Sequence, residues 1–201
     1  MKLSNKHLFT GKSKGFTLVE LLVVISIIAT LGALSYGPIM KQIENSQVLK
    51  ATKVCNDLVA AIDNFQIDYG YLPYEGAAYV PTDALIETDA TAGIDFLNVL
   101  IGNNININDR GISYFDADQA DGVTDGLVLN QAGNILSLVD KWGNPYSILL
   151  DYDQNGMISL APLTIEEDAG RYDADRQTTS AVVLSPGRDG LFDDIKDSTS
   201  F

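Results

Sequence analysis

The chain has 201 residues, which allows one modest domain and an anchor but not two full domains. It carries 13 basic and 27 acidic side chains, for a formal net charge of −14. Such a surface repels the phosphate backbone of nucleic acids and favours cations, so we expect no nucleic-acid partner. Cys55 is the single cysteine, which excludes an intrachain disulfide.

A short basic segment, residues 1–15, precedes an apolar run from Phe16 to Tyr36. The run has 21 residues, and Glu20 is its one charge. A helix of that length measures roughly 32 Å, enough to cross the hydrocarbon core of a bilayer. Lysines before the run place the N-terminus in the cytoplasm by the positive-inside rule, and the remainder of the chain outside it. We therefore predict a single-pass membrane protein whose spanning segment is residues 16–38.

Glu20 is unusual because a carboxylate inside a spanning segment costs roughly 2.5–3.5 kcal/mol on insertion scales. The run contains no lysine, arginine or histidine to pair with it. Cleavage between Gly15 and Phe16 would create an α-amine four residues away, and the amine of a neighbouring copy would neutralise the carboxylate. Alternatively, Glu20 lies near the membrane interface and its side chain reaches water. Position alone leaves both interpretations open.

The heptapeptide Gly15-Phe16-Thr17-Leu18-Val19-Glu20-Leu21 resembles the processing signal of type IV pilins and type II secretion pseudopilins. The resemblance implies that a prepilin peptidase cuts after Gly15 and methylates Phe16, and that Glu20 guides filament assembly. Loss of the leader leaves nine basic and 27 acidic side chains, a net charge of −18. It also removes His7, the single histidine, which excludes Ser-His and Cys-His mechanisms and the usual zinc sites. We therefore expect a structural protein and not an enzyme.

Residues 39–69 predict an amphipathic second half of the same helix. Apolar side chains recur there in steps of three and four, which is typical of one buried stripe. The stripe consists of Val48, Ala51, Cys55, Leu58, Ile62, Phe65 and Tyr69. Its position makes Cys55 a core residue rather than a reactive thiol. Three residues midway, Gly32, Gly37 and Pro38, predict a kink or local unwinding.

Residues 70–201 are expected to form an α+β domain outside the cytoplasm. The helix should end near Gly70, since Pro73 blocks its continuation. A short helix is predicted within 82–103, with Gly102 as its stop. Strands are predicted at Ser113–Phe115, Leu127–Asn130, Tyr146–Asp151, Met157–Leu160 and Ala181–Leu184, forming a small antiparallel sheet on the helix stripe. We interpret residues 75–135 as an insertion of unknown role.

Three segments of this domain also resemble the major pseudopilins of type II secretion. Tyr69-Gly70-Tyr71-Leu72-Pro73 is similar to the region that closes their long helix. Asp140-Lys141-Trp142-Gly143-Asn144-Pro145-Tyr146 is close to their Trp-Gly-Asn-Pro-Tyr signature. Ser185-Pro186-Gly187-Arg188-Asp189-Gly190, followed by Asp193-Asp194-Ile195, resembles their C-terminal calcium loop. The resemblance implies a type IV pilin-like fold, in which a long N-terminal α-helix packs on a small antiparallel β-sheet.

The resemblance also implies partners and a location. The partners are further copies of the chain, minor pseudopilins, the prepilin peptidase, the inner-membrane secretion platform and membrane lipid. The location is the inner membrane, with the C-terminal domain in the periplasm, where the filament forms.

The C-terminal loop is the first candidate metal site, because hard oxygen ligands in a flexible loop suit Ca²⁺. Asp189, Asp193 and Asp194 lie within six residues, and Ser185 and backbone carbonyls could complete the ligands. A solvated acidic tail is the alternative. We expect calcium with a structural role.

Asp151, Asp153 and Asn155, followed by Gly156, form a second candidate site. They match the first half of an EF-hand loop, but Pro162 stands where its bidentate glutamate belongs. A hairpin turn built from Asp, Asn and Gly explains the same residues.

We expect a pseudopilus subunit whose filament helps drive protein export. A surface type IV pilus subunit for adhesion, motility or DNA uptake is the alternative. A third hypothesis belongs to a different functional class, a membrane-tethered carboxylate enzyme or calcium-binding module. Acidic pairs such as Glu166-Glu167 support it. Adjacent residues point to opposite faces of a strand, so such pairs are poorly placed for catalysis.

Overall fold

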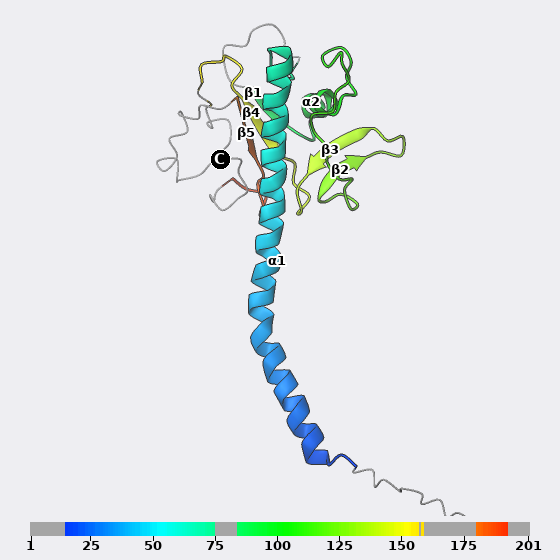
Figure 1. The fold of residues 1–201 in the computed structure, drawn as a ribbon, viewed down its shortest axis with the longest axis vertical. Coiled ribbons are helices and arrows are strands. Elements are labelled where there is room, and N and C mark those ends of the chain that lie inside the picture. The colour runs from blue at the N-terminus through cyan, green and yellow to red at the C-terminus, as the bar shows by residue number, and fades with distance from the viewer. Residues whose placement is uncertain (1–14, 75–83, 157, 159–179, 193–201) are drawn as a thin grey trace, which may run out of the picture. The chain divides into compact units, whose positions relative to one another are not determined.

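The computed structural model describes residues 15–74, 84–156, 158 and 180–192 (Figure 1). The chain divides into two compact units, residues 1–43 and 44–201. The elements are α1 (Leu18–Tyr69), β1 (Ala84–Glu87), α2 (Thr91–Ile101), β2 (Gly126–Leu129), β3 (Ile135–Val139), β4 (Ser147–Leu150) and β5 (Ala181–Leu184). The long helix α1 and the short antiparallel strands form the expected α+β arrangement, which is consistent with a pilin-like fold.

Helix α1 is one continuous element of 52 residues, with Pro38 inside it. The local unwinding predicted at Gly32, Gly37 and Pro38 is wrong, since all three lie in unbroken helix. A proline removes only one intrahelical N–H donor. Good helix formers lie on both sides of it, Ala33 and Leu34 before it and Met40 and Lys41 after it, so the helix continues through the proline.

The first unit contains a segment suited to a membrane. Among the described residues, α1 is the one helix long and apolar enough to span a bilayer, and none of its most apolar window is buried within the protein. Side chains from Leu18 to Tyr36 are exposed on every face of the helix. An all-round apolar surface of this kind needs lipid or another chain to cover it.

In the second unit, one stripe of α1 is buried, as predicted. Its buried residues are Ala51, Cys55, Leu58, Ala61, Ile62 and Phe65. They pack in a single core with α2 and with strands of both sheets. Cys55 is fully buried there, and this burial raises the pKa of its thiol far above the ordinary range. The thiol is therefore a packing group, as the stripe predicted.

The main sheet has the strand order β1-β4-β5, with both pairs antiparallel and β4 central. Every residue of β4 and β5 is buried. Alternate residues such as Ile148 and Val183 join the core with α1, while Leu149 and Val182 pack against Ile158 on the other face. Because both faces are covered, these strands are continuously apolar instead of alternating.

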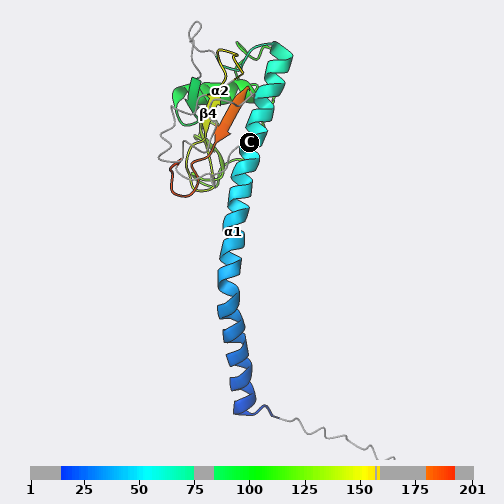
Figure 2. The same cartoon turned by 90° about the vertical axis from the view of Figure 1, so that its left-hand side faces the viewer.

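A second sheet pairs β2 with β3, with an irregularity between Val128 and Leu129. In Figure 1 the β1-β4-β5 sheet is drawn to the left of α1 and the β2-β3 pair to its right, while Figure 2 shows α2 and β4 together on one side of α1 within the second unit. The strand predicted at Leu127–Asn130 is present as β2, whereas β3 was not predicted.

Of the elements predicted from residue 82 to β2, the helix is present and the strand is not. Helix α2 is present, and Gly102 ends it with a left-handed φ of 87°, which glycine adopts without strain. Strand β1 was missed, because residues 82–103 were interpreted as a loop and a short helix. The strand predicted at Ser113–Phe115 is wrong. Tyr114 and Phe115 instead donate their backbone N–H groups to the Leu100 carbonyl, which α2 leaves unpaired at its end. Most of the strand predicted at Met157–Leu160 lies outside the described residues.

The segment interpreted as an insertion, residues 75–135, is an integral part of the domain where the structure describes it. It supplies α2 and two of the strands, and it buries Ile86, Phe96, Leu100 and Phe115. It also meets the end of α1, where Tyr69 stacks on Phe65 at 4.4 Å and donates a hydrogen bond to Asn108 at 2.9 Å. Removing it would therefore expose the core.

The buried stripe of α1 provides a stability test with a matched control. Replacing the fully buried Ile62 by alanine should lower the free energy of unfolding by about 2–5 kcal/mol, through lost burial and a cavity. The same change at Ile67, which is 79% exposed on the same helix, should cost no more than about 0.5 kcal/mol. Urea denaturation in detergent micelles, followed by fluorescence of the single tryptophan, measures both. Equal losses would contradict the packing.

Candidate functional site

Helix α1 begins with a reciprocal pair of hydrogen bonds between Thr17 and Glu20. The Glu20 Oε2 atom accepts from the Thr17 backbone N–H and from its hydroxyl, both at 2.8 Å. In return, the backbone N–H of Glu20 donates to the Thr17 Oγ1 atom at 3.2 Å. This is a capping box, which satisfies two donors that a helix start otherwise leaves unpaired.

The capping box changes the interpretation of Glu20. Its carboxylate has a partner within its own chain, whereas the sequence analysis considered only the amine of another copy or water at the membrane interface. Both side-chain contacts use Oε2, and among the described residues Oε1 has no hydrogen bond. The carboxylate is therefore oriented but not neutralised. The signal was present in the sequence, since Thr-x-x-Glu before an apolar run is the capping-box pattern.

The predicted cleavage point, Gly15-Phe16, lies immediately before the helix. Both residues are exposed and outside any helix or strand, and Phe16 is 81% exposed. A Cβ atom added to Gly15 would meet nothing within 4 Å. The packing of this chain therefore does not require glycine there, which suits a residue selected by an external enzyme.

In the second unit, a buried carboxylate joins the two C-terminal motifs. Asp140 is 1% exposed, and its Oδ1 accepts from the backbone N–H groups of Trp142 and Asn144, both at 2.9 Å. Its Oδ2 accepts from the Ser185 hydroxyl at 2.8 Å. The side-chain amide of Asn144 donates to the Gly187 carbonyl at 2.6 Å. The 140–146 and 185–190 motifs thus form one corner, although the sequence presented them as separate.

Burial raises the pKa of Asp140, and the donors from Ser185, Asn144 and Trp142 offset only part of that effect. An unpaired carboxylate in such a place would be far more costly. The three donors are therefore what allows a carboxylate to hold the corner together.

The first candidate calcium loop is partly described. Asp189 is exposed, and its Oδ1 accepts from the Leu191 N–H at 3.1 Å. The Ser185 hydroxyl is buried and already bonded to Asp140 and to the Gly187 N–H, so only its carbonyl suits a metal. Asp193 and Asp194 lie outside the described residues.

In the second candidate site, Asp151 to Gly156, the side chains form hydrogen bonds within the segment itself. The two carboxylate oxygens of Asp151 accept from the N–H groups of Asn155 and Gly156, at 3.0 and 2.8 Å. Asp153 accepts from the Asn155 side chain at 2.7 Å. These bonds favour the turn interpretation. Across the described residues, no three His, Cys, Asp or Glu side chains are grouped so that they could hold a metal ion.

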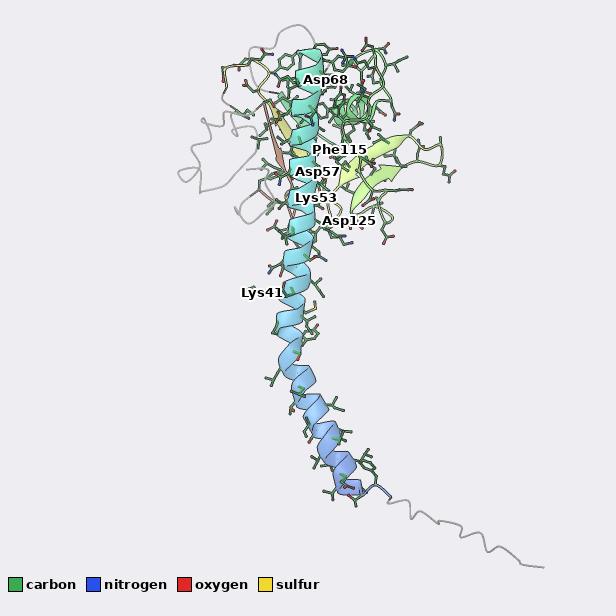
Figure 3. All side chains as sticks on the ribbon, in the orientation of Figure 1. Lys41, Lys53, Asp57, Asp68, Phe115 and Asp125 are labelled. Carbon is green, nitrogen blue, oxygen red and sulfur yellow. The ribbon has the colours of Figure 1, made fainter. Side chains whose placement is uncertain are left out.

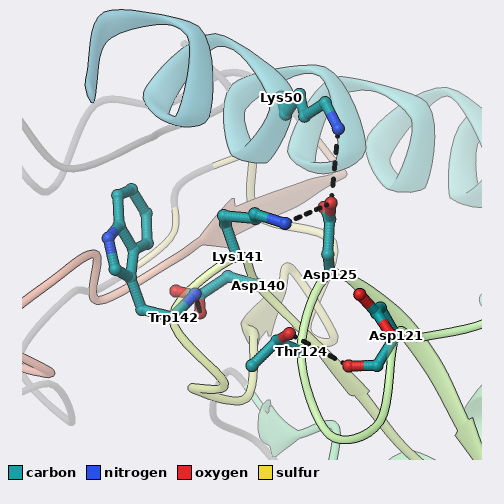
Figure 4. A network of polar contacts seen from close by, with 7 residues as sticks. All are labelled: Lys50, Asp121, Thr124, Asp125, Asp140, Lys141 and Trp142. Carbon is teal, nitrogen blue, oxygen red and sulfur yellow. Dashed lines mark hydrogen bonds and ion pairs between the residues drawn. The ribbon is translucent and has the colours of Figure 1, made fainter. Parts of the chain in front are cut away.

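Asp125 is a charged residue that the sequence did not single out. Its carboxylate accepts from Lys50 of α1 at 3.3 Å and from Lys141 at 3.2 Å (Figure 4). Burial alone would raise the pKa of Asp125, but the two lysines together lower it. Asp125 and Lys50 are 75 residues apart, so no spacing rule could have paired them. The contact links α1 to the start of β2.

Comparison with known proteins bears on the N-terminus. Residues 10–36 match a family model described as the prokaryotic N-terminal methylation motif. The chain carries this motif. The match supports a type IV pilin-like protein, a subunit of either a pilus or a pseudopilus. With the apolar half of α1, it indicates membrane anchoring by a single N-terminal helix. Neither the curated proteins nor the solved structures compared with the chain gave a match.

The capping box predicts a local effect of Thr17. Replacing Thr17 by valine keeps the shape but removes the hydroxyl, which should cost the first turn about 1 kcal/mol. Amide exchange at Glu20 and Leu21, whose N–H groups donate to Thr17, should then become about fivefold faster when measured by NMR in micelles. Ser26→Ala is the control, because the Ser26 hydroxyl bonds to Val23 within the helix and caps nothing. Equal exchange in the two variants would exclude a capping role.

Proposed function

We propose that this chain is a structural subunit of a membrane-anchored filament, matured by a prepilin peptidase that cuts between Gly15 and Phe16 and methylates the new terminus. The methylation motif at residues 10–36 carries the proposal, because it stands directly before a helix whose apolar half is unburied. The exposed cleavage point and the absence of a packing role for Gly15 support it.

Assembly would use the charge on Glu20. Cleavage turns Phe16 into a terminus with a cationic amine, and copies that bundle their apolar helices exclude water around it. The capping box already turns one oxygen of Glu20 toward its own helix start, while Oε1 remains available to the amine of a neighbouring copy. Charge pairing in an apolar surrounding is much stronger than in water, so it would favour the correct axial register.

The filament proposed is the pseudopilus of type II secretion, which helps drive protein export from the periplasm. The corner between the 140–146 and 185–190 motifs supports this choice, since both motifs resemble major pseudopilins. The chain would then be held in the inner membrane with its second unit in the periplasm. It would work with minor pseudopilins and the secretion platform.

A surface type IV pilus subunit is the second candidate, because the methylation motif is common to both. A single cysteine gives this chain no C-terminal disulfide, which weighs against the pilus. Neighbouring genes distinguish the two. An outer-membrane secretin with export partners would support the pseudopilus, and retraction machinery would support the pilus.

We also propose that Ca²⁺ binds the C-terminal loop through Asp189, with Asp193 and Asp194 as further ligands and the Ser185 carbonyl in support. Asp189 is exposed, and the corner beneath it holds the loop at Ser185 and Gly187. Bound calcium would neutralise the like charges of this loop and so stabilise it. For Asp151, Asp153 and Asn155 we propose a hydrogen-bonded turn, with metal binding as the alternative.

The role of Glu20 is tested by two substitutions that separate charge from capping. Glu20→Gln keeps an acceptor for Thr17 but has no charge, whereas Glu20→Ala loses both. Both variants should insert into the membrane normally and form no filaments, because neither can pair with the amine. Ser26→Ala should assemble as the unmodified chain does.

Membrane fractionation and electron microscopy of sheared filaments give the readout, and the mass of the mature chain reports the cut and the methyl group. Normal filaments from Glu20→Gln would rule out charge pairing. An uncut chain would rule out the proposed maturation.

Calcium is tested by thermal unfolding of the full chain in micelles, with excess calcium or with a chelator. At 100 times its dissociation constant, a ligand adds about 2.7 kcal/mol, which raises the Tm by roughly 5–10 °C for a domain of this size. Asp189→Asn should abolish the shift. Asp95→Asn, which changes an exposed acid on α2, should retain it. An unchanged midpoint in the parent chain would contradict a structural ion.

A further inference from the structure

We propose that a groove beside α1 receives residues 188–191 of a second copy, so that copies join laterally; this rests on the proposed filament function. The groove is a cavity of about 340 Å³ between α1 and residues 115–121. Its floor is apolar and includes Phe115, Leu138 and Tyr146, each at most 2% exposed. Figure 3 labels Phe115 beside Lys53, Asp57 and Asp125, which lie on the groove.

The groove is lined by more carboxylates than lysines, so it could accept a cation from another chain. Its two lysines are already paired within the chain, Lys53 with Asp57 at 2.5 Å and Lys50 with Asp125 at 3.3 Å. Three other lining carboxylates, those of Asp116, Asp118 and Asp121, have no ion pair within 4 Å among the described residues, although the charge of Asp118 acts on Lys53. An apolar floor beside unpaired carboxylates fits a ligand that presents a cation next to an apolar side chain.

Residues 188–191 of this chain present that combination through Arg188 and Leu191, while Asp189 between them is the proposed calcium ligand. Arg188 also has an ion pair, with Glu44 at 3.4 Å, but both side chains are exposed, at 76% and 53%, so little stability is lost when this pair opens. Leu191 is 56% exposed nearby in the chain. The guanidinium of arginine matches carboxylates as a fork, which a lysine cannot do. Arg110, the other described arginine, lies over the Tyr69 ring at 5.2 Å and is already engaged.

The loop that carries Arg188 is held in shape before any contact. Asn144 donates to the Gly187 carbonyl at 2.6 Å, and the Ser185 hydroxyl accepts from the Gly187 N–H at 3.2 Å. Gly187 and Gly190 have φ angles of 72° and 75°, a turn shape that glycine adopts without strain. Such preorganisation lowers the entropic cost of binding.

The positions of loop and groove favour an open polymer. Glu44, which pairs with Arg188, and Lys53, which lines the groove, are nine residues apart, and therefore about 180° apart around the helix. A surface that binds a different surface on the next copy makes a heterologous contact, which continues into a fibre when it does not close into a ring. It also brings unlike charges together in a mature chain of net charge −18.

The contact is tested by exchanging charges in the full-length chain. Asp118→Arg and Arg188→Asp should each lower the yield of sheared filaments about tenfold, because each places like charges together. The double variant restores an opposite pair and should recover to within about threefold of the parent chain. Asp95→Arg combined with Arg188→Asp is the matched control, which changes an exposed acid outside the groove and should not recover.

A folding control and a cross-linking experiment accompany the charge exchange. Cys55 is fully buried and is the single cysteine, so its lack of reaction with a maleimide reports that a variant is folded. In a separate chain, Gln119→Cys with Leu191→Cys should give a ladder of disulfide-linked multimers on oxidation, whereas Asp95→Cys with Leu191→Cys should not.

The failure of this proposal is distinct from that of the proposed function. A parent chain that forms no filaments would overturn both. Parent filaments with no effect of the single reversals, no recovery in the double variant, or no ladder would overturn the groove contact alone.

Discussion

The structure depends on one constraint, that a single helix must be stable in two different surroundings. Because its backbone hydrogen bonds are internal, α1 can carry an apolar surface on every face without leaving polar groups unpaired, as a segment in lipid requires. From Ala51 to Phe65 the same helix buries only one stripe of side chains. The hydrophobic effect therefore has a different consequence in each half of the helix. It keeps the first half out of water, and it packs the domain on the second.

The domain built on that stripe is held by more than apolar contact. Asp140 accepts three hydrogen bonds in a buried corner and so connects the turn after β3 to the loop after β5. Asp125 connects α1 to the same region through two lysines. A buried or half-buried carboxylate is costly unless it is fully bonded, so each of these groups favours one arrangement of loops over its alternatives. The loop after β5 is the one that carries the proposed calcium ligands and Arg188.

The N-terminal and C-terminal features serve one proposed mechanism. Glu20 and the Phe16 amine would set the register between helices, while the groove and residues 188–191 would join the second units of neighbouring copies. The first contact is short-ranged and shielded from water, and the second is a pairing of exposed charges that responds to salt. A filament whose subunits are strongly acidic needs such localised attraction to offset general repulsion.

Local signals in the sequence were sufficient for the parts of the protein that depend on neighbours in the chain. The apolar run, the stripe of α1, the end of α2 at Gly102 and the processing motif could all be predicted, because each depends on periodicity or on a few adjacent residues. The Thr17–Glu20 box was equally local but went unrecognised. Strand β3 pairs with β2 across a short turn, so it was a local element that the sequence analysis missed. Tertiary structure alone decided that β1 is a strand, since its partner β4 is distant in the chain, with Ala84 paired to Leu150. It also decided that Ser113–Phe115 is not a strand, because the end of α2 takes its backbone N–H groups. It further decided that Lys50 meets Asp125 across 75 residues and that Asp140 meets Ser185 across 45. Contacts over such separations depend on how the whole core closes, and no local pattern encodes them.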